Sequence, residues 1–223
     1  TVDATDNVVN LSAANAVLLN GKLTAADNNV VLDTNANIRA LTAAQLGGLT
    51  NIDAVDASDN VLTTDVAQTA AITNAKLTAA DAVTVTDTGA NLAAAAGVTV
   101  AQFANVDAID ASDNVLNLTV ANAALVTNAK LTAADVVTLV DTGANIVTAA
   151  ATTVSFANVD FVDASDNAIT ATQAQFASIT NAKLVANDVV TLADTNTNLQ
   201  AGGAVLNSAA TVAAATNVDG FDV

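Results

Sequence analysis

Hydrophobic and polar residues alternate along short stretches of this chain, and Ala-rich stretches separate them. In Asp53–Leu62, aliphatic residues alternate with Asp, Ser and Asn. A period of two residues predicts a β-strand with one buried face. The Ala-rich stretches predict short helical return segments, for which Thr64 or Asp65 and, in another copy, Thr99 are the expected N-caps. The pattern therefore predicts short strands that alternate with short helices.

The strand-like stretches belong to an internal repeat. The phrase DATDNV at the N-terminus returns three times, as DASDNV or DASDNA, in steps of 53, 54 and 53 residues. A second phrase, LDTNANI, returns between these copies as TDTGANL, VDTGANI and ADTNTNL. Repeats of this length are typical of solenoids, in which each unit contacts only its neighbours. The first phrase begins at Asp3, Asp56, Asp110 and Asp163, and the second at Leu32, Thr86, Val140 and Ala193.

Each repeat holds two strand-like segments whose apolar positions correspond. The corresponding pairs are Val55 with Val85, Ile109 with Leu139, and Val162 with Leu192. We therefore predict a single β-solenoid of parallel strands with short helical returns. It has about eight coils in four tandem units, approximately residues 3–55, 56–109, 110–162 and 163–218. Because another copy of the first phrase starts at Asn217, we expect a piece of a longer chain or a subunit that assembles end to end.

The first coil of each pair resembles a leucine-rich repeat. The pattern L-x-x-L-x-L-x-x-N-x-L falls on Ile52, Val55, Ala57, Asn60 and Leu62, with Ala in place of one Leu. The resemblance covers about half of the chain. It implies a curved parallel solenoid with one strand per coil and a buried Asn that satisfies backbone groups at each turn. The later copies are Val106, Ile109, Ala111, Asn114 and Leu116, then Val159, Val162, Ala164, Asn167 and Ile169.

The second coils depart from this pattern at the phrase DTGAN. Gly89 and Gly143 stand where the other copies have Asn35 and Asn196. Gly and Asn are the residues that tolerate a positive φ best. We therefore predict a left-handed residue in a tight turn at this position, capped by the Asp two residues earlier.

The composition excludes several kinds of functional site. The chain has no Cys or His, every acidic residue is Asp, and the net charge is −17. Zinc, haem and iron–sulfur sites of the usual kind are thereby excluded, and the common general bases are missing. No enzyme is predicted. A strongly acidic chain repels nucleic acids and anionic lipid surfaces, and no stretch is apolar enough to span a membrane.

The Ala-, Thr- and Asp-rich, Lys-poor composition also resembles the long repeats of bacterial surface-layer proteins and giant secreted adhesins, including those of RTX type. The resemblance implies an exported chain that binds calcium. The G-G-x-G-x-D nonapeptide of the RTX β-roll is absent.

Calcium is the candidate metal, because Asp carboxylates and backbone carbonyls are the ligands that it prefers. One set of candidate ligands lies at the turns, and a second set points outward from the strands. The alternative is an acidic surface that only discourages aggregation. The turn set is Asp59, Asp113 and Asp166, and the strand set is Asp56, Asp110 and Asp163.

The predicted function is structural: a segment of an extracellular bacterial surface layer, fibre or adhesin stalk, whose partners are neighbouring repeats or further copies of itself. The alternative is a calcium-dependent module that binds a glycan, a protein or a neighbouring subunit. The periodic lysines are expected to form weak surface ion pairs, the alternative being an anchor for a ligand or another chain. They are Lys22, Lys76, Lys130 and Lys183.

Overall fold

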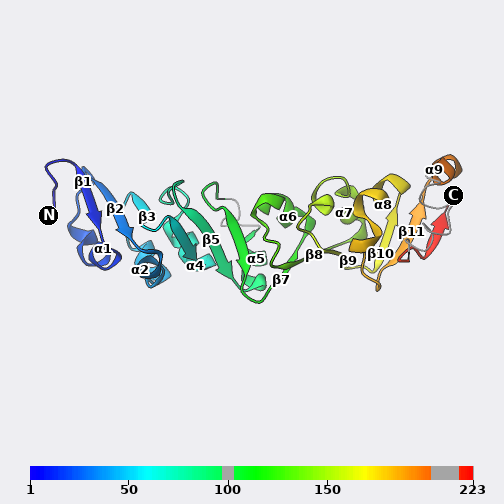
Figure 1. Cartoon of the computed structure of the whole chain (residues 1–223), viewed down its shortest axis with the longest axis horizontal. Helices are drawn as coiled ribbons and strands as arrows, with labels where there is room; N and C mark the ends of the chain where they lie inside the picture. The colour runs from blue at the N-terminus through cyan, green and yellow to red at the C-terminus, as the bar shows by residue number, and fades with distance from the viewer. Residues whose placement is uncertain (97–102, 202–215, 223) are drawn as a thin grey trace. The chain divides into compact units, whose positions relative to one another are not determined.

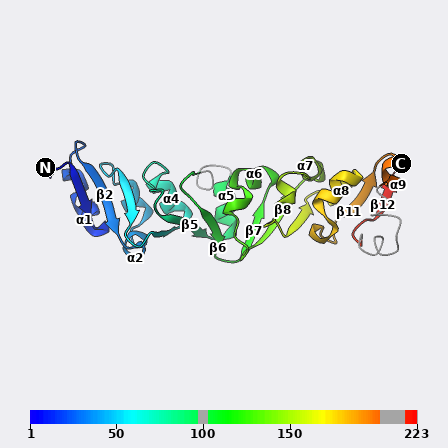
Figure 2. The same ribbon diagram turned by 45° about the horizontal axis from the view of Figure 1, so that its top comes forward.

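The computed structural model describes residues 1–96, 103–201 and 216–222, and divides the chain into two compact units, Thr1–Asp113 and Asn114–Val223. Within the described residues, the strands form four three-stranded parallel sheets, two in each unit, with helices between successive strands (Figures 1 and 2). The predicted combination of parallel strands and short helical returns is therefore confirmed. The expected N-cap Thr99 lies outside the described residues.

The first unit contains two sheets. The strands of the first sheet are β1 (Val8–Leu11), β2 (Asn28–Asp33) and β3 (Ala54–Ala57), and those of the second are β4 (Val61–Thr64), β5 (Ala82–Asp87) and β6 (Ala108–Ala111). The helices are α1 (Ala13–Leu19), α2 (Asn35–Arg39), α3 (Ala43–Gly47), α4 (Val66–Ile72), α5 (Gly89–Ala96) and the 3-10 turn η1 (Asn20–Lys22).

The second unit repeats this order. Its sheets consist of β7 (Val115–Leu118), β8 (Val136–Asp141) and β9 (Phe161–Ala164), then β10 (Ala168–Ala171), β11 (Val189–Ala193) and β12 (Gly220–Asp222). Its helices are α6 (Val120–Val126), α7 (Gly143–Thr148), α8 (Gln173–Ile179) and α9 (Asn196–Ala201), with the 3-10 turns η3 (Asn128–Lys130), η4 (Thr153–Ser155) and η5 (Asn181–Lys183).

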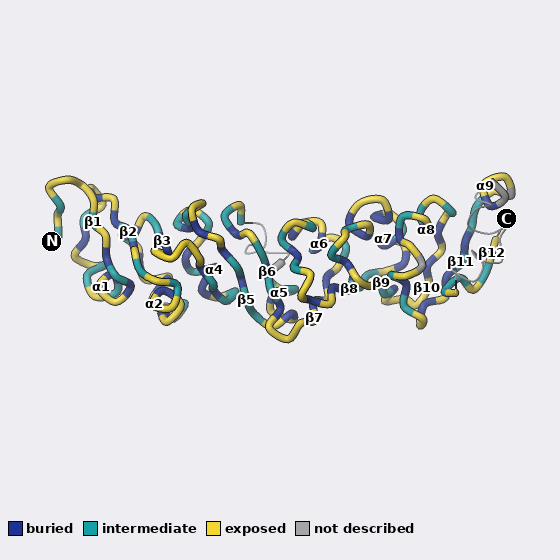
Figure 3. Tube along the Cα trace, in the orientation of Figure 1, coloured by how far each residue is buried: buried dark blue, intermediate teal, exposed yellow. Residues whose placement is uncertain are grey.

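The core of each sheet is a row of aliphatic side chains that crosses all three strands. In the third sheet, Leu139 of the central strand β8 pairs in register with Leu118 and Val162. All three side chains are almost fully buried, and Figure 3 marks such inward positions in dark blue. The predicted pairs Val55 with Val85, Ile109 with Leu139 and Val162 with Leu192 lie on strands of different sheets, whereas Val85 pairs in register with Ile109, and Leu139 with Val162.

A turn of three residues breaks the expected ladder of one strand per coil. β3 pairs with β2, but β4, which follows after Ser58–Asn60, pairs with β5. The N–H of Asn60 donates to the carbonyl of Ala57 at 2.7 Å, and Asn60 has a φ of 56°. The chain bends too sharply there for β4 to continue the sheet of β3. One isolated parallel bridge, between Val55 and Leu77, still joins neighbouring coils across the break.

The prediction of a buried Asn at this turn is wrong. Asn60, Asn114 and Asn167 are exposed and have φ values of 54–56°. Asn is the non-glycine residue that most readily adopts the left-handed region, because its short side chain pays a small steric penalty there. These residues form the turn with their backbones and do not fill the core.

The prediction of a left-handed residue at the Gly/Asn position is also wrong. Asn35, Gly89 and Gly143 begin α2, α5 and α7, and no glycine in the described ranges has a positive φ. At Gly143 the constraint is space, since an added Cβ would overlap the carbonyl oxygen of Ala168 in β10. In this copy, α7 begins so close to β10 that there is no room for a side chain at its first residue.

The helix ends show one expected and one unexpected feature. Asp65 is the N-cap of α4, and its carboxylate forms a capping box with Gln68. At the C-caps of α4, α6 and α8, however, a β-branched residue has a φ of 66–68°. This backbone region is costly for any residue with a Cβ. The three residues are Thr73, Thr127 and Thr180.

Candidate functional site

The aspartates are the candidate functional residues of this chain, and the structure gives most of them a shared task. Within the described ranges, at least fourteen Asp carboxylates accept a hydrogen bond from a backbone N–H that lies 20 to 29 residues earlier in the chain. These are Asp27, Asp33, Asp53, Asp59, Asp81, Asp87, Asp107, Asp113, Asp141, Asp160, Asp166, Asp188, Asp194 and Asp219.

The first group of these aspartates lies where the central strand of each sheet ends. At the end of β8, Oδ2 of Asp141 accepts the N–H of Val120 at the start of α6, at 3.1 Å. Its Oδ1 accepts the N–H of Thr142 at 2.8 Å and the side-chain amide of Asn145 at 2.7 Å. One carboxylate thus joins the starts of α6 and α7. The prediction that this Asp caps a left-handed residue two positions later is wrong, because the N–H of Gly143 donates to Asp166. Asp33, Asp87 and Asp194 make the same set of contacts.

These hydrogen bonds stabilise the charged form of the carboxyl group. Burial alone would raise the pKa of Asp141, but the hydrogen bonds from Asn145, Thr142 and Val120 outweigh it and lower the pKa below its usual value. For Asp33, the side chain of Asn37 is the largest cause of the lowered pKa. Asp87 and Asp194 also have lowered pKa values.

A second group precedes the third strand of each sheet. The carboxylate of Asp107 accepts the N–H of Val83 at 2.8 Å, while the N–H of Asp107 donates to the carbonyl of Val83 at 2.9 Å. The two bonds close a ring between adjacent coils. The same ring forms at Asp53, Asp160 and Asp219.

A third group is buried. Asp81 is 4% exposed, and its Oδ2 accepts the N–H of Ala57 and the hydroxyl of Thr78, whereas its Oδ1 has no partner. In the fourth repeat Val185 replaces this Thr, so Asp188 has no such hydroxyl donor. Burial raises the pKa of Asp188 against the hydrogen bond from Ala164, and the charges of two nearby Asp residues raise it further. Asp27 and Asp135 are the other two members of the group.

The predicted calcium ligands at the turns cap helices of the neighbouring coil. The Oδ1 atoms of Asp59, Asp113 and Asp166 accept the N–H of Asn35 at 3.0 Å, of Gly89 at 2.9 Å and of Gly143 at 2.9 Å. Each of these donors is the first residue of a helix, whose N–H has no partner within the helix. Sequence analysis assigned these positions to a metal because the donors lie about one coil away, where no local pattern points to them.

The outward aspartates of the predicted strand set are dispersed. Asp56, Asp110 and Asp163 are partly exposed, on the third strands of three different sheets. Asp110 lies opposite Thr86 and Asp163 opposite Val140. Within the ranges that the structure describes, no group of three or more His, Cys, Asp or Glu side chains is placed to hold a metal. Calcium binding at either set stays a hypothesis.

A substitution separates the capping role from calcium binding. We expect Asp113→Ala to lower the free energy of unfolding by about 1 kcal/mol, the usual cost of a lost helix cap. The matched control Asp110→Ala should lower the free energy of unfolding by less. Thermal unfolding in the presence of calcium and in the presence of a chelator tests for calcium binding. We expect the same unfolding midpoint under both conditions. A midpoint that rises by many degrees with calcium, and does so less in Asp113→Ala, would show a metal site at the turn.

Sequence analysis missed a clamp formed by asparagine pairs. The N–H of Asn105 donates to Oδ1 of Asn74 at 3.0 Å, and its side-chain amide donates to the carbonyl of Leu77 at 2.7 Å. Asn51 and Asn158 form the same clamp with Asn20 and Asn128. This is the role that the leucine-rich-repeat resemblance implied for the turn asparagines. The available signal was the Asn that stands two residues before Asp in each copy of NIDA, NVDA or NVDF.

Two of the periodic lysines, for which we expected weak surface ion pairs, donate to backbone carbonyl groups. Nζ of Lys76 donates to the carbonyl of Leu49 at 2.6 Å. Nζ of Lys183 donates to the carbonyls of Val154 and Phe156 at 2.9 and 2.7 Å. Burial lowers the pKa of Lys183, although the charge of Asp160 partly opposes this. Both lysines satisfy backbone groups in the loop that precedes a third strand.

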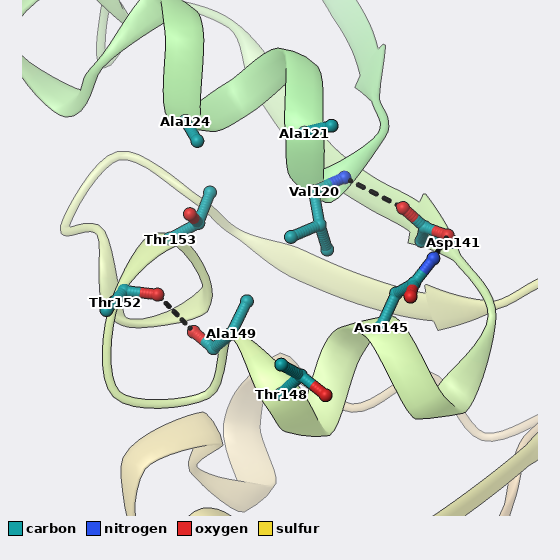
Figure 4. Close-up of a pocket in the computed structure, with 9 residues that line it drawn as sticks. All are labelled: Val120, Ala121, Ala124, Asp141, Asn145, Thr148, Ala149, Thr152 and Thr153. Atoms are coloured by element: carbon teal, nitrogen blue, oxygen red, sulfur yellow. Dashed lines mark hydrogen bonds between the residues drawn. The ribbon is translucent and has the colours of Figure 1, made fainter.

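The second unit contains a hollow between α6 and α7, with a volume of about 390 Å³ (Figure 4). Its wall includes the carboxylate of Asp141, whose oxygens accept the bonds from Val120, Thr142 and Asn145 described above. The remaining polar groups are mainly Thr hydroxyls beside Ala methyl groups, so the hollow has little to orient a ligand. It is lined by Val120, Ala121, Ala124, Asp141, Asn145, Thr148, Ala149, Thr152 and Thr153.

No known protein family matches this chain. No curated protein and no solved structure matches it either. Across the described residues, no helix has both the length and the apolar character needed to cross a membrane. The repeat and its hydrogen bonds are therefore the features of this chain that bear on its function.

Proposed function

We propose that this chain is a structural spacer, a solenoid segment of an extracellular bacterial surface layer, fibre or adhesin stalk. The observation that carries the proposal is the use of the carboxylates. At least fourteen of them hold backbone N–H groups of the preceding strand–helix segment, so the residues best suited to chemistry serve the scaffold. A site that acts on a ligand is built once, whereas these contacts recur in every repeat.

The spacer proposal predicts that length follows the number of repeats. Deletion of residues 56–109 joins Val55 to Asp110 and restores the phrase NIDAVDASDN, so the splice keeps the register. Duplication of the same segment adds one repeat. We expect the maximum dimension in small-angle X-ray scattering to fall and rise by equal increments, because each repeat contacts only its neighbours.

Two further measurements complete this test. Circular dichroism at each length checks that the variants fold, and antibody labelling of intact cells checks the surface location. Equal maximum dimensions for the shortened and lengthened chains, with folded spectra, would contradict the spacer role. Electron microscopy of the purified chain distinguishes a lattice or fibre component, which forms ordered assemblies, from a stalk segment, which stays monomeric.

A further inference from the structure

Two asparagines occupy exposed strand positions for which the fold provides no reason. Asn10 and Asn117 are the third residues of β1 and β7, and both side chains are exposed. Neither carboxamide has a hydrogen-bond partner in the described part of the chain, unlike the paired asparagines of the clamps. Asn is depleted in strands, and the equivalent positions of β4 and β10 carry the better strand formers Thr63 and Thr170.

Both asparagines begin a modification sequence. Asn10-Leu11-Ser12 and Asn117-Leu118-Thr119 are the two N-x-[ST] sequences of the chain, and that sequence is the acceptor for N-linked glycans. The hydroxyl residue is the N-cap of the following helix in both copies, where it accepts a backbone N–H. It still carries a proton to donate. In the repeat with Thr63, the residue two places later is Asp65, so neither half of the sequence is present.

The positions also suit access by a modifying enzyme. Among the described strands, β1 pairs with β2 alone and β7 with β8 alone, so both asparagines lie on edge strands. Beside them on the same face, two residues earlier, stand Val8 and Val115, which are 47% and 48% exposed. A glycan on each Asn would extend from an open face and cover an exposed apolar side chain.

We propose that Asn10 and Asn117 are N-glycosylation sites. The side-chain nitrogen of Asn forms a bond to the anomeric carbon of a sugar carried by a polyprenyl-phosphate donor. The bond from that carbon to the phosphate oxygen breaks, the phosphate leaves with the electron pair, and the amide proton passes to it. The transferase and its lipid-linked sugar are co-reactants from the cell envelope, so the proposal rests on the surface location proposed above.

Mass spectrometry of the protein from its native cells tests the proposal directly. We expect tryptic or chymotryptic peptides that contain Asn10 and Asn117 to carry a mass increment made of sugar residues, with fragment ions that place it on the Asn. Unmodified Asn at both positions, in protein that surface labelling has located outside the cell, would overturn it. The length-scaling experiment uses chain made in a host without such transferases, so the two proposals fail separately.

Secretion through a host that glycosylates N-x-[ST] sequences tests the positions. The wild-type chain should gain two glycans, Asn10→Gln or Asn117→Gln one, and the double variant none. The matched control Thr63→Asn with Asp65→Thr builds the sequence on β4 while keeping a capping residue, and should add a third glycan. A wild-type chain that stays unmodified, while a co-secreted acceptor protein is modified, would show that these strand positions are closed to the enzyme.

Discussion

Replacement of Leu139 by alanine is expected to lower the free energy of unfolding by about 3 to 5 kcal/mol. Leu139 is fully buried on the central strand of its sheet, between Leu118 and Val162 in register. Its removal leaves a cavity that both neighbouring strands border, and small aliphatic neighbours cannot reach across to fill it. The row of aliphatic residues would thus be interrupted at its middle.

Urea unfolding followed by circular dichroism measures this loss. Thr138→Ala is the matched control, since Thr138 precedes Leu139 on β8 and is partly exposed on the outer face. We expect the control to cost less than about 1 kcal/mol, the span of strand propensities. Equal losses for the two variants would show that the inward row does not hold the sheet together.

We expect the chain to lose stability as the pH falls, because the aspartates at the ends of the central strands stabilise the fold in their charged form. The pKa values of Asp33, Asp87, Asp141 and Asp194 are lower in the folded chain than the usual 3.8. Their contribution to stability is therefore present above the unfolded pKa and is lost as pH falls through the folded values, between about pH 5 and pH 1. Asp188 has the opposite sign, because its folded pKa is raised and its ionisation at neutral pH opposes folding.

The effect of net charge on stability must be separated from the effect of these hydrogen bonds. The chain carries −17 charges at neutral pH, so acid also relieves repulsion between carboxylates. At about 1 M salt the Debye length is about 3 Å and this repulsion is largely screened. We expect the urea midpoint at high salt to fall steadily from pH 5 to pH 3, and to fall less in Asp141→Asn, which keeps an oxygen acceptor but does not titrate. A midpoint that is independent of pH under these conditions would contradict the structural role of the carboxylates.

Sequence analysis correctly predicted the aliphatic rows and the short helical returns, because both depend on local patterns. Alternation placed Val55, Ile109 and Val162 inside, and the choice of Thr64 or Asp65 as N-cap before an Ala-rich run placed the start of α4. The break between β3 and β4 was not predicted, because an Asn that follows Asp is equally compatible with a row of buried asparagines and with a left-handed turn. Nothing in the residue type predicts a positive φ at Thr73, since Thr is poorly suited to it.

The partners of the aspartates could not be predicted from local patterns. A carboxylate and its N–H donor lie 20 to 29 residues apart in the chain, and only the tertiary fold brings them together. The composition gives an indirect indication of these contacts. The chain has no Glu and no Pro, and both absences suit these contacts. Asp has one rotatable bond fewer than Glu and so loses less entropy when fixed against a neighbouring coil, while Pro would remove the N–H that the carboxylate needs.

The donors in these contacts have a consequence for the history of the gene. The N–H groups belong to Ala, Val, Asn, Gly and Gln, so the contact depends on the main chain, and residues other than proline can supply it except at Gly143, where there is no room for a side chain. Unequal crossing-over between two copies would therefore preserve these contacts at the junction when the copies recombine in register. A change in copy number that keeps this register would alter the length of the chain without a new set of side-chain contacts.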